Sequence, residues 1–361
     1  YNRKQEVEKM ADLEMLKQFS LANGISGYEK HITRLMKTYL EEYADEIQYD
    51  GLGSLIAIQN GESPFKVLLT AHVDEIGFLV KNIDEHGFIQ VQPVGGWNPR
   101  HLPSSLMNIE TRDGQNIKGV MALKQQTPKE KVLTVDDLYL DVGAFSKQDV
   151  LDMGIGKGDP VTPVSDFIMM QNEKCVLSKA WDDRIGVAVM VEVMKRLHHE
   201  KIYPTLYVAG TVQEEVGLRG AKTVAQMVQP DLALAIDVTF SYDLPGGEQG
   251  DVRLGNGVAL CVMDGSVIGH TGLLKQLENI CRNHHIAYQL DMDLAGGTDS
   301  GELSKVGQGV MNLTISIPTR YMHSHYTMIH LDDFEATVDM LVAFLKEFDE
   351  DMYMSMVEDK R

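Results

Sequence analysis

The stretch TLYVAGTVQEEVGLRGAKTVAQMVQPDLALAIDV, residues 205–238, places a helical segment between two apolar runs. TLYVAGTVQ and LALAIDV are short runs typical of buried strands, and GAKTVAQMV between them is predicted to be a helix. A strong helical pattern, DDRIGVAVMVEVMKRLHHE, precedes the stretch at residues 182–200. Alternating strands and helices indicate βαβ units. We therefore predict an α/β fold with a mixed, mostly parallel sheet flanked by helices.

The pattern of apolar residues and turns differs on the N-terminal side of this stretch. Residues 11–24 and 28–47 have apolar residues at helical spacing, and residues 54–60 and 65–80 are predicted strands. Between residues 81 and 166 short strands alternate with turns, including a likely hairpin turn at Asp113-Gly114. We predict a catalytic domain formed by residues 10–80 and 167–361, with residues 81–166 inserted as a small, barrel-like β domain. Residues 1–9 are charged, without apolar periodicity, and are predicted to be an extension outside the fold.

Composition limits the class of protein. The chain has 361 residues, of which 43% are hydrophobic and 24% charged, enough for a large core and two domains. Its net charge of −20 argues against nucleic acid or an anionic membrane as partner. We find no apolar run near the roughly 20 residues of a membrane span and no secretory signal, so we expect a cytoplasmic protein. Three cysteines without CxxC spacing predict neither a disulfide framework nor a zinc knuckle.

Five short stretches each bring an acidic residue or a histidine close to an apolar run. They are VLLTAHVDE (67–75), KAWDDR (179–184), VQEEVG (212–217), LAIDVT (234–239) and RYMHSH (320–325). Four of them follow predicted strands, and ligands of open α/β sheets bind beyond the carboxyl ends of strands. The candidate side chains are His72, Asp74, Asp182, Glu214, Glu215, Asp237 and His323. Two divalent ions need about this set of donors, with one carboxylate shared and one left free as a base.

The adjacent pair Glu214-Glu215 carries the most mechanistic information. Neighbouring side chains leaving a strand point to opposite sides, so one can bind metal while the other stays free. The free carboxylate can take a proton from the attacking water and pass it to a leaving amine, which is general acid/base catalysis of amide hydrolysis. Asp74, two residues after His72, lies on the same strand face and is expected to orient the imidazole.

These residues resemble those of the M42 metallo-aminopeptidases, a family of the wider di-zinc peptidase clan, over nearly the whole chain from Met10. The order His, Asp, Glu-Glu, Asp, His is specific to that clan. The resemblance implies that one metal is held by His72, Asp182 and Asp237. It implies that Asp182, Glu215 and His323 hold the other, with Asp182 bridging and Glu214 as general base. Zn, Co and Mn all suit such donors.

The same resemblance extends to the substrate side and to assembly. GGTDSG, residues 296–301, matches a family segment near the active site, which makes Thr298 and Asp299 candidates for substrate contacts. The inserted β domain matches the dimerisation domain of the family. Such proteins are similar to one another in forming large homo-oligomeric shells, often dodecamers built from dimers and arranged as a tetrahedron.

GGWNP (95–99), SKAWDDR (178–184) and RYMHSH look most like the glutamyl aminopeptidase branch. In that branch the strand after the LGNG turn, here residues 254–257, carries an arginine that we expect to pair with an acidic substrate side chain. This sequence has Cys261 there. A thiol supplies neither the charge nor the donors of a guanidinium. A neutral or aliphatic first residue is therefore at least as well supported as an acidic one, and Cys261 becomes a candidate substrate-binding residue.

Alternative functions fit the motifs less well. The sequence has neither a GxSxG elbow nor a GxxxxGK[ST] loop, which disfavours a serine hydrolase and a phosphate-binding enzyme. An endoglucanase-type glycoside hydrolase needs two carboxylates and no metal, which leaves the two histidines without a role. A catalytically silent shell protein has no use for an intact Glu214. The sequence therefore predicts a metal-dependent aminopeptidase that removes the N-terminal residue of peptides.

Overall fold

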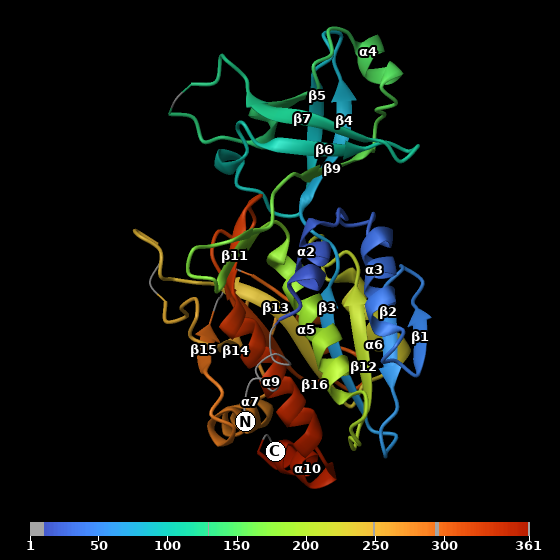
Figure 1. The fold of residues 1–361 in the computed structure, drawn as a ribbon, viewed down its shortest axis with the longest axis vertical. Coiled ribbons are helices and arrows are strands. Elements are labelled where there is room, and N and C mark those ends of the chain that lie inside the picture. The colour runs from blue at the N-terminus through green and yellow to red at the C-terminus, as the bar shows by residue number, and fades with distance from the viewer. Residues whose placement is uncertain (1–10, 129, 248–249, 293–295, 360–361) are drawn as a thin grey trace.

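The computed structural model describes residues 11–128, 130–247, 250–292 and 296–359, and the predicted extension, residues 1–9, lies outside these ranges. Within them the chain forms an eight-stranded sheet, a closed six-stranded barrel and a small three-stranded sheet. Figure 1 shows the barrel at the top and the large sheet with its helices below it. The predicted class, an α/β fold with a mostly parallel sheet and a barrel-like insertion, is confirmed.

The large sheet sets the direction in which the functional residues point. From one edge to the other its strands are β1 (Glu46–Tyr49), β2 (Leu55–Gln59), β12 (Thr205–Thr211), β3 (Lys66–His72), β13 (Leu232–Phe240), β16 (Met311–Thr319), β14 (Val258–Met263) and β15 (Tyr288–Met292). The four central strands, β12, β3, β13 and β16, are parallel to one another, and β14 runs antiparallel to β16. The carboxyl ends of the central strands therefore meet at one edge of the sheet.

Helices cover both faces of the large sheet. One face carries α2 (Leu13–Leu21), α3 (Lys30–Leu40), α5 (Trp181–Leu197), α7 (Thr271–Asn283), α9 (Leu331–Glu347) and α10 (Glu350–Glu358). The other carries α6 (Arg219–Val228) and α8 (Ser300–Leu303). Val67 and Leu69 of β3 pack in the larger core, and Leu68 between them packs in the smaller one. Burial on both faces explains why the central strands are apolar without alternation.

The barrel forms its own core at the carboxyl edge of the large sheet (Figure 1). Its strands, in order around the barrel, are β4 (Gly77–Ile83), β5 (Ile89–Val94), β8 (Leu138–Asp141), β7 (Asn116–Leu123), β6 (Leu106–Glu110) and β9 (Pro160–Pro163). Short helical segments η1 (Pro99–His101), η2 (Val135–Asp137) and α4 (Lys147–Asp152) connect them. Gly114 takes a φ of +79° in the hairpin between β6 and β7. The barrel strands run from residue 77 to 163, against the predicted segment 81–166.

A small sheet joins two segments that are far apart in sequence. Its strands are β10 (Ile168–Met169), β11 (Cys175–Ser178) and β17 (Thr327–His330), with Ser178 paired to Thr327. The chain leaves β11 toward Asp182 and enters β17 from His323. This pairing therefore brings the second and fifth predicted ligand segments, KAWDDR and RYMHSH, together. In the ranges described above, none of the helices has both the length and the hydropathy needed to span a bilayer.

Candidate metal centre

All six predicted ligands and bases converge on one cavity of about 490 Å³ at the carboxyl edge of the large sheet. His72 is the last residue of β3, and Glu214 and Glu215 follow the end of β12. Asp237 lies within β13, in register with Ser316 of β16. The remaining two, Asp182 and His323, come from the segments next to the small sheet. Strand geometry thus accounts for their convergence.

Asp182 stands between the two histidines. Its Oδ1 lies 2.9 Å from Nε2 of His72, and its Oδ2 lies 3.2 Å from Nε2 of His323. Asp182 can reach both rings because the first residues of α5 have non-helical φ/ψ angles, so regular helix begins only after Asp183. One carboxylate therefore faces two imidazoles through different oxygens, which is the arrangement that a shared ligand of two ions requires.

The two adjacent glutamates take different neighbours. Glu215 Oε1 lies 3.7 Å from Nε2 of His323, whereas Glu214 Oε2 lies 4.0 Å from Nε2 of His72. Donor atoms of Asp182, Glu215 and His323 all lie within 4.8 Å of one another. The two glutamate side chains therefore face different histidines, as expected for adjacent residues just after a strand.

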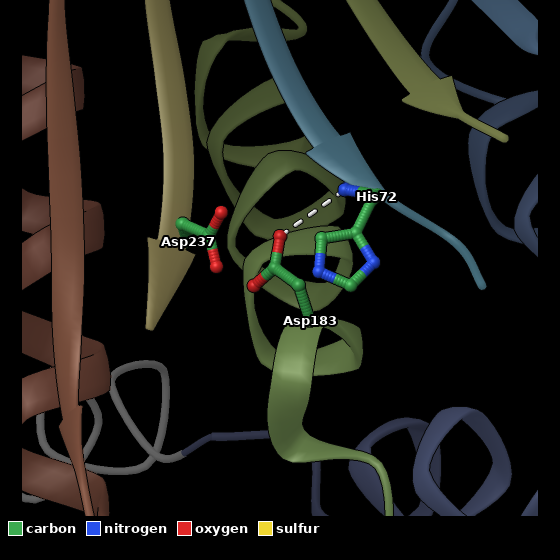
Figure 2. Close-up of side chains that lie close together, drawn as sticks. All are labelled: His72, Asp183 and Asp237. Carbon is green, nitrogen blue, oxygen red and sulfur yellow. Dashed lines mark hydrogen bonds between the residues drawn. The ribbon is translucent and has the colours of Figure 1, made fainter. Parts of the chain in front are cut away.

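Asp183 is a buried carboxylate that the sequence analysis did not single out. Its Oδ2 accepts a hydrogen bond from the backbone N–H of His72 at 3.2 Å, and its Oδ1 accepts one from Gly186. Figure 2 shows Asp183 between His72 and Asp237, whose donor atoms form a second group within 4.8 Å. Its position next to Asp182 in the acidic pair of KAWDDR was the available signal. With both oxygens bound to backbone amides, Asp183 anchors the end of β3 to the start of α5.

Asp74 organises the glutamate pair. Its Oδ1 accepts a hydrogen bond from the N–H of Glu214 and its Oδ2 one from Glu215, at 3.0 and 3.2 Å. The ring of His72 lies 3.0 Å from the Asp74 carbonyl oxygen and 3.6 Å from its carboxylate. The carboxylate thus holds the backbone on which Glu214 and Glu215 stand, and the carbonyl contacts the imidazole.

The backbone around the cavity is strained. Ala180, Gln213 and His323 have φ values of 53°, 58° and 57°, in the left-handed region that non-glycine residues seldom adopt. Each such residue costs about 1–3 kcal/mol and persists only where surrounding structure enforces it. Gly96 allows close approach, since a Cβ there would lie 3.0 Å from Nδ1 of His323. Strain concentrated beside the predicted ligands is typical of a functional site.

The donor set fits divalent first-row metal ions. It consists of two imidazole nitrogens and several carboxylate oxygens, clustered in overlapping groups of three. A family model of the M42 glutamyl aminopeptidases matches residues 53–340 of this chain. The chain belongs to the M42 family. It is accordingly a peptidase hydrolase, as the sequence predicted.

The sequences of individual relatives align with the M42 chain over most of its length. A relative from Acetivibrio thermocellus is 37% identical, covering 93% of this chain and 98% of its own. A glutamyl aminopeptidase of Lactococcus lactis subsp. cremoris is 33% identical, with 86% and 88% covered. A lysyl aminopeptidase of Pyrococcus furiosus is 31% identical, with 94% and 98% covered. The names of these relatives include both an acidic and a basic first residue.

Solved structures show the same architecture. A TET aminopeptidase from a marine sediment archaeon of the Thaumarchaeota superposes with a TM-score of 0.92 at 34% identity, covering 95% of this chain and 99% of its own. The Pyrococcus horikoshii TET1 peptidase, which can assemble into a tetrahedron or a large octahedral shell, gives 0.85 at 31%, with 93% and 99% covered. A Thermotoga maritima structure named as an endoglucanase gives 0.77 at 29%, with 96% and 99% covered. These similarities show that the M42 chain shares the fold of the TET aminopeptidases.

Burial and crowding set the electrostatics of the M42 centre. Burial first, and then the Asp182 charge, raise the pKa of Glu215 to about 8, and burial likewise raises the pKa of Asp237 to about 8. Burial alone would lower the pKa of His323, but its hydrogen bond to Asp182 and the Glu215 charge raise it to about 9. Burial also raises the pKa of Glu214 well above its usual value. Cations bound at the cluster would relieve this excess of negative charge.

A buried ion-pair network lies behind the M42 centre. Nζ of Lys179 donates to both carboxylate oxygens of Glu75, at 2.6 and 2.7 Å, and both side chains are almost fully buried. The guanidinium of Arg184 donates to backbone carbonyls of Phe19, Ala22 and Gly24. These contacts hold the residues on both sides of Asp182 against Glu75 and against the end of α2 and the residues that follow it. Sequence reasoning missed the network because its members are far apart in the chain.

The predicted substrate-side residues occupy different positions. Thr298 and Cys261 line the cavity. Asp299 is 3% exposed, and its Oδ2 accepts a hydrogen bond from Thr211 on β12. Asp299 is outside the lining of this cavity, so its contact with substrate remains a prediction.

Proposed function

We propose that this M42 chain is a two-metal aminopeptidase that removes the N-terminal residue of peptides. The observation that carries the proposal is the position of Asp182 between His72 and His323, with one carboxylate oxygen facing each ring. His72, Asp182 and Asp237 would hold one ion, and Asp182, Glu215 and His323 the other, with Zn, Co or Mn as candidates. Bound ions would lower the pKa of the attacking water and stabilise the negative charge that develops on the scissile carbonyl oxygen.

Glu214 is the proposed general base. It takes a proton from water as the carbon–oxygen bond forms, and it returns the proton to the amine nitrogen as the peptide bond breaks. Its buried position at the cavity wall and its raised pKa suit a group that must both accept and release a proton. Asp74 acts as a positioning residue, because its carboxylate holds the N–H groups of Glu214 and Glu215.

Recognition of a free α-amine would restrict cleavage to the chain end. The cavity beside the proposed ligands is lined by buried carboxylates, among them Asp237 and Glu214. A protonated amine is stabilised in such surroundings, whereas an acylated amine is neutral and bulkier. Thr298 offers a hydroxyl at the cavity wall, and the adjacent Asp299 is proposed to act near the substrate through this segment. Peptides with a free N-terminus are therefore the proposed substrates.

The barrel is the proposed dimerisation domain of a homo-oligomeric shell. Its surface exposes large apolar side chains, with Phe145 at 91% and Val132 at 77% exposure. Apolar groups presented in this way are stabilised by burial against a partner. The tetrahedral assembly of the TET1 relative supports a dodecamer built from dimers. A cytoplasmic location completes the proposal and suits three buried cysteines that are not joined in disulfides.

Rates on metal-stripped protein test the proposal. Unblocked amino-acid p-nitroanilides should be hydrolysed only after Zn, Co or Mn is restored, and their N-acetylated counterparts should not be hydrolysed at all. A carboxymethylcellulose control addresses the endoglucanase alternative, which needs neither metal nor histidines. Cleavage of cellulose without metal, or an absence of amide hydrolysis under every metal condition, would overturn the proposal.

A further inference from the structure

Three successive backbone amides follow shortly after the end of β12, and each donates a hydrogen bond to a buried carboxylate. The N–H of Gln213 donates to Oε1 of Glu29 at 3.1 Å. The next two amides, of Glu214 and Glu215, donate to the two oxygens of Asp74 at 3.0 and 3.2 Å. Glu29 and Asp74 belong to separate segments of the chain. The turn that carries the proposed base is therefore held by two segments, and only one of them was predicted.

Glu29 belongs to the loop between α2 and α3, residues 24–29. It is the residue just before α3 and is 5% exposed. Its Oε1 accepts a second hydrogen bond, from the N–H of Gly27 at 2.7 Å. One oxygen atom thus joins this loop to Gln213, which is 184 residues further along the chain. Since the oxygen is held by its own loop, it is a fixed acceptor for the amide of Gln213.

The loop itself is fastened to the segment that follows β3. Oγ of Ser26 donates to Oδ2 of Asp74 at 2.5 Å, and both residues are buried. The N–H of Glu75 donates to the carbonyl oxygen of Gly24 at 3.0 Å, and the N–H of Gly24 donates to Oε1 of Glu75 at 3.1 Å. Residues 24–29 therefore form a rigid support, because they contact both of the carboxylates that hold the turn.

Gln213 is the position where this support has the most effect. Its φ of 58° lies in the left-handed region, which has a steric cost for a residue with a Cβ and persists only where surrounding structure enforces it. Its N–H is bonded to Glu29, and its carbonyl oxygen accepts a hydrogen bond from the N–H of Arg219 at 3.2 Å. Glu214 follows directly, so the backbone angles of Gln213 set the direction of the Glu214 side chain.

From these contacts we propose that Glu29 is a positioning residue, which holds Gln213 in its left-handed conformation and so directs the Glu214 carboxylate toward the reacting water. The proposal rests on the proposed aminopeptidase function, in which Glu214 is the general base. Glu29 is not among the described residues that line the cavity, so it acts through Gln213 and not on the substrate. Misplacing a base affects proton transfer more than substrate binding, so losing this support should lower kcat while KM changes little.

Two neutral variants of similar length separate the hydrogen bond from the charge. Glu29→Gln keeps an oxygen acceptor, whereas Glu29→Met offers only a weakly accepting sulfur. Burial raises the pKa of Glu29 to about 7, so its charged and neutral forms differ little in free energy near neutral pH. We expect kcat to stay within about threefold of the unmutated value in Glu29→Gln and to fall about ten- to a hundredfold in Glu29→Met, at nearly unchanged KM.

A third variant keeps the charge and shortens the reach. Glu29→Asp removes one methylene, so the carboxylate is drawn back from the amide of Gln213, and kcat should fall about three- to tenfold. This change is small enough to decide the question if Glu29→Met does not assemble.

The measurement uses the assembled, metal-loaded, full-length protein with leucyl and lysyl p-nitroanilides, and sedimentation and zinc calorimetry on the same samples verify assembly and metal uptake. Asp84→Leu is the matched control. Oδ1 of Asp84 accepts the N–H groups of His86 and Phe88, each at 2.9 Å, in the barrel hairpin between β4 and β5. This variant loses a carboxylate that holds a loop elsewhere in the molecule, so its kcat should be unchanged.

The outcomes separate this inference from the proposed function. Equal kcat values for Glu29→Met and Glu29→Gln, or a loss that appears only in KM or in zinc uptake, would overturn the positioning role and leave the aminopeptidase intact. Should Glu29→Met fail to assemble, an unchanged kcat in Glu29→Asp would overturn it as well. An absence of hydrolysis by the unmutated, metal-loaded protein would contradict the aminopeptidase itself, and with it this role of Glu29.

Discussion

The proposed metal centre and the barrel shift the pKa values of their carboxylates in opposite directions. In the barrel, a hydrogen bond from Lys131, with further bonds from Thr134, lowers the pKa of Asp137 to about 2. At the metal centre, burial and crowding raise the pKa of Glu215 and of Asp237 to about 8. The barrel acid is satisfied by residues close in sequence. The acids of the centre lack such compensation and are suited to bind cations from outside the chain.

The backbones of the two regions differ in the same sense. Left-handed positions in the barrel are mostly glycines in turns, such as Gly87, Gly114 and Gly143, with Ser104 as an exception. Around the centre, Gln213 and His323 take left-handed conformations that carry a steric cost. Strain and unbalanced charge therefore coincide at the centre, which indicates that this region is shaped for chemistry and the barrel for stability.

The largest expected effect follows from removing the proposed base. Glu214→Gln keeps the size of the side chain but cannot accept a proton, so kcat should fall about 10²- to 10⁴-fold. Asp137→Asn in the barrel removes a carboxylate whose pKa is lowered instead of raised, and it should leave kcat unchanged. Steady-state kinetics on both variants, with sedimentation to verify assembly, make the comparison. An active Glu214→Gln variant would exclude Glu214 as the base.

Breaking the buried ion pair should affect stability next most strongly. Lys179→Met leaves the buried Glu75 carboxylate without its closest partner and should lower the free energy of unfolding by about 3–5 kcal/mol. Lys131→Met, at a pair in the barrel where the lysine is 44% exposed, should cost less than about 1 kcal/mol. Denaturant unfolding of both variants provides the measurement. Equal costs would mean that the network behind the centre is no more important than a surface pair.

The metal-free protein should lose stability as pH rises. The folded pKa values of Glu215 and Asp237, about 8, exceed the ordinary values of 4.5 and 3.8, so the folded state binds more protons than the unfolded state between about pH 4 and 8. Stability conferred by these protonated groups is lost across that window. The raised pKa of His323, about 9, has the same sign at higher pH. Asp137, whose pKa is lowered, contributes constant stability above pH 4.

Thermal unfolding of the metal-stripped protein at pH 5.5 and pH 8 measures this dependence of stability on pH. Tm should be several degrees lower at pH 8, and bound metal should abolish most of the difference. Asp237→Asn should reduce the slope, whereas Asp137→Asn should not. A metal-free Tm that rises between these pH values would contradict the account of a crowded, overcharged centre.

The smallest effect on chemistry is expected at the barrel surface. Phe145→Ser removes a side chain that is 91% exposed, so subunit stability should change by less than about 0.5 kcal/mol. If the barrel is the dimerisation domain, the assembly should dissociate toward smaller species while turnover of p-nitroanilides per subunit is maintained. Light scattering measures the mass of the assembly, and kinetics on the same sample measure the turnover per subunit. An unchanged mass would place the interface elsewhere.

Much of this arrangement could be predicted from the sequence because it depends on local pattern. The apolar runs of residues 67–71, 205–211 and 232–236 identify central strands, and parallel strands must bring His72, Glu214 and Asp237 to one edge. Contacts that cross the fold could not be predicted. The hydrogen bonds that Asp74 accepts from the amides of Glu214 and Glu215, and the pair Lys179–Glu75, depend on the packing of distant segments. Asp183 was missed because its adjacency to Asp182 does not reveal which oxygen faces which partner.

Metal titration of the stripped protein tests the central claim most directly. Calorimetry with Zn²⁺ should give two ions per subunit, with leucyl or lysyl amide hydrolysis rising in parallel. Asp182→Asn should weaken both binding events, because Asp182 faces both histidines, whereas His323→Ala should remove only one. Binding of two ions together with metal-dependent turnover is the result expected here. A single equivalent, or hydrolysis undiminished after stripping, would contradict a shared-carboxylate, two-metal centre.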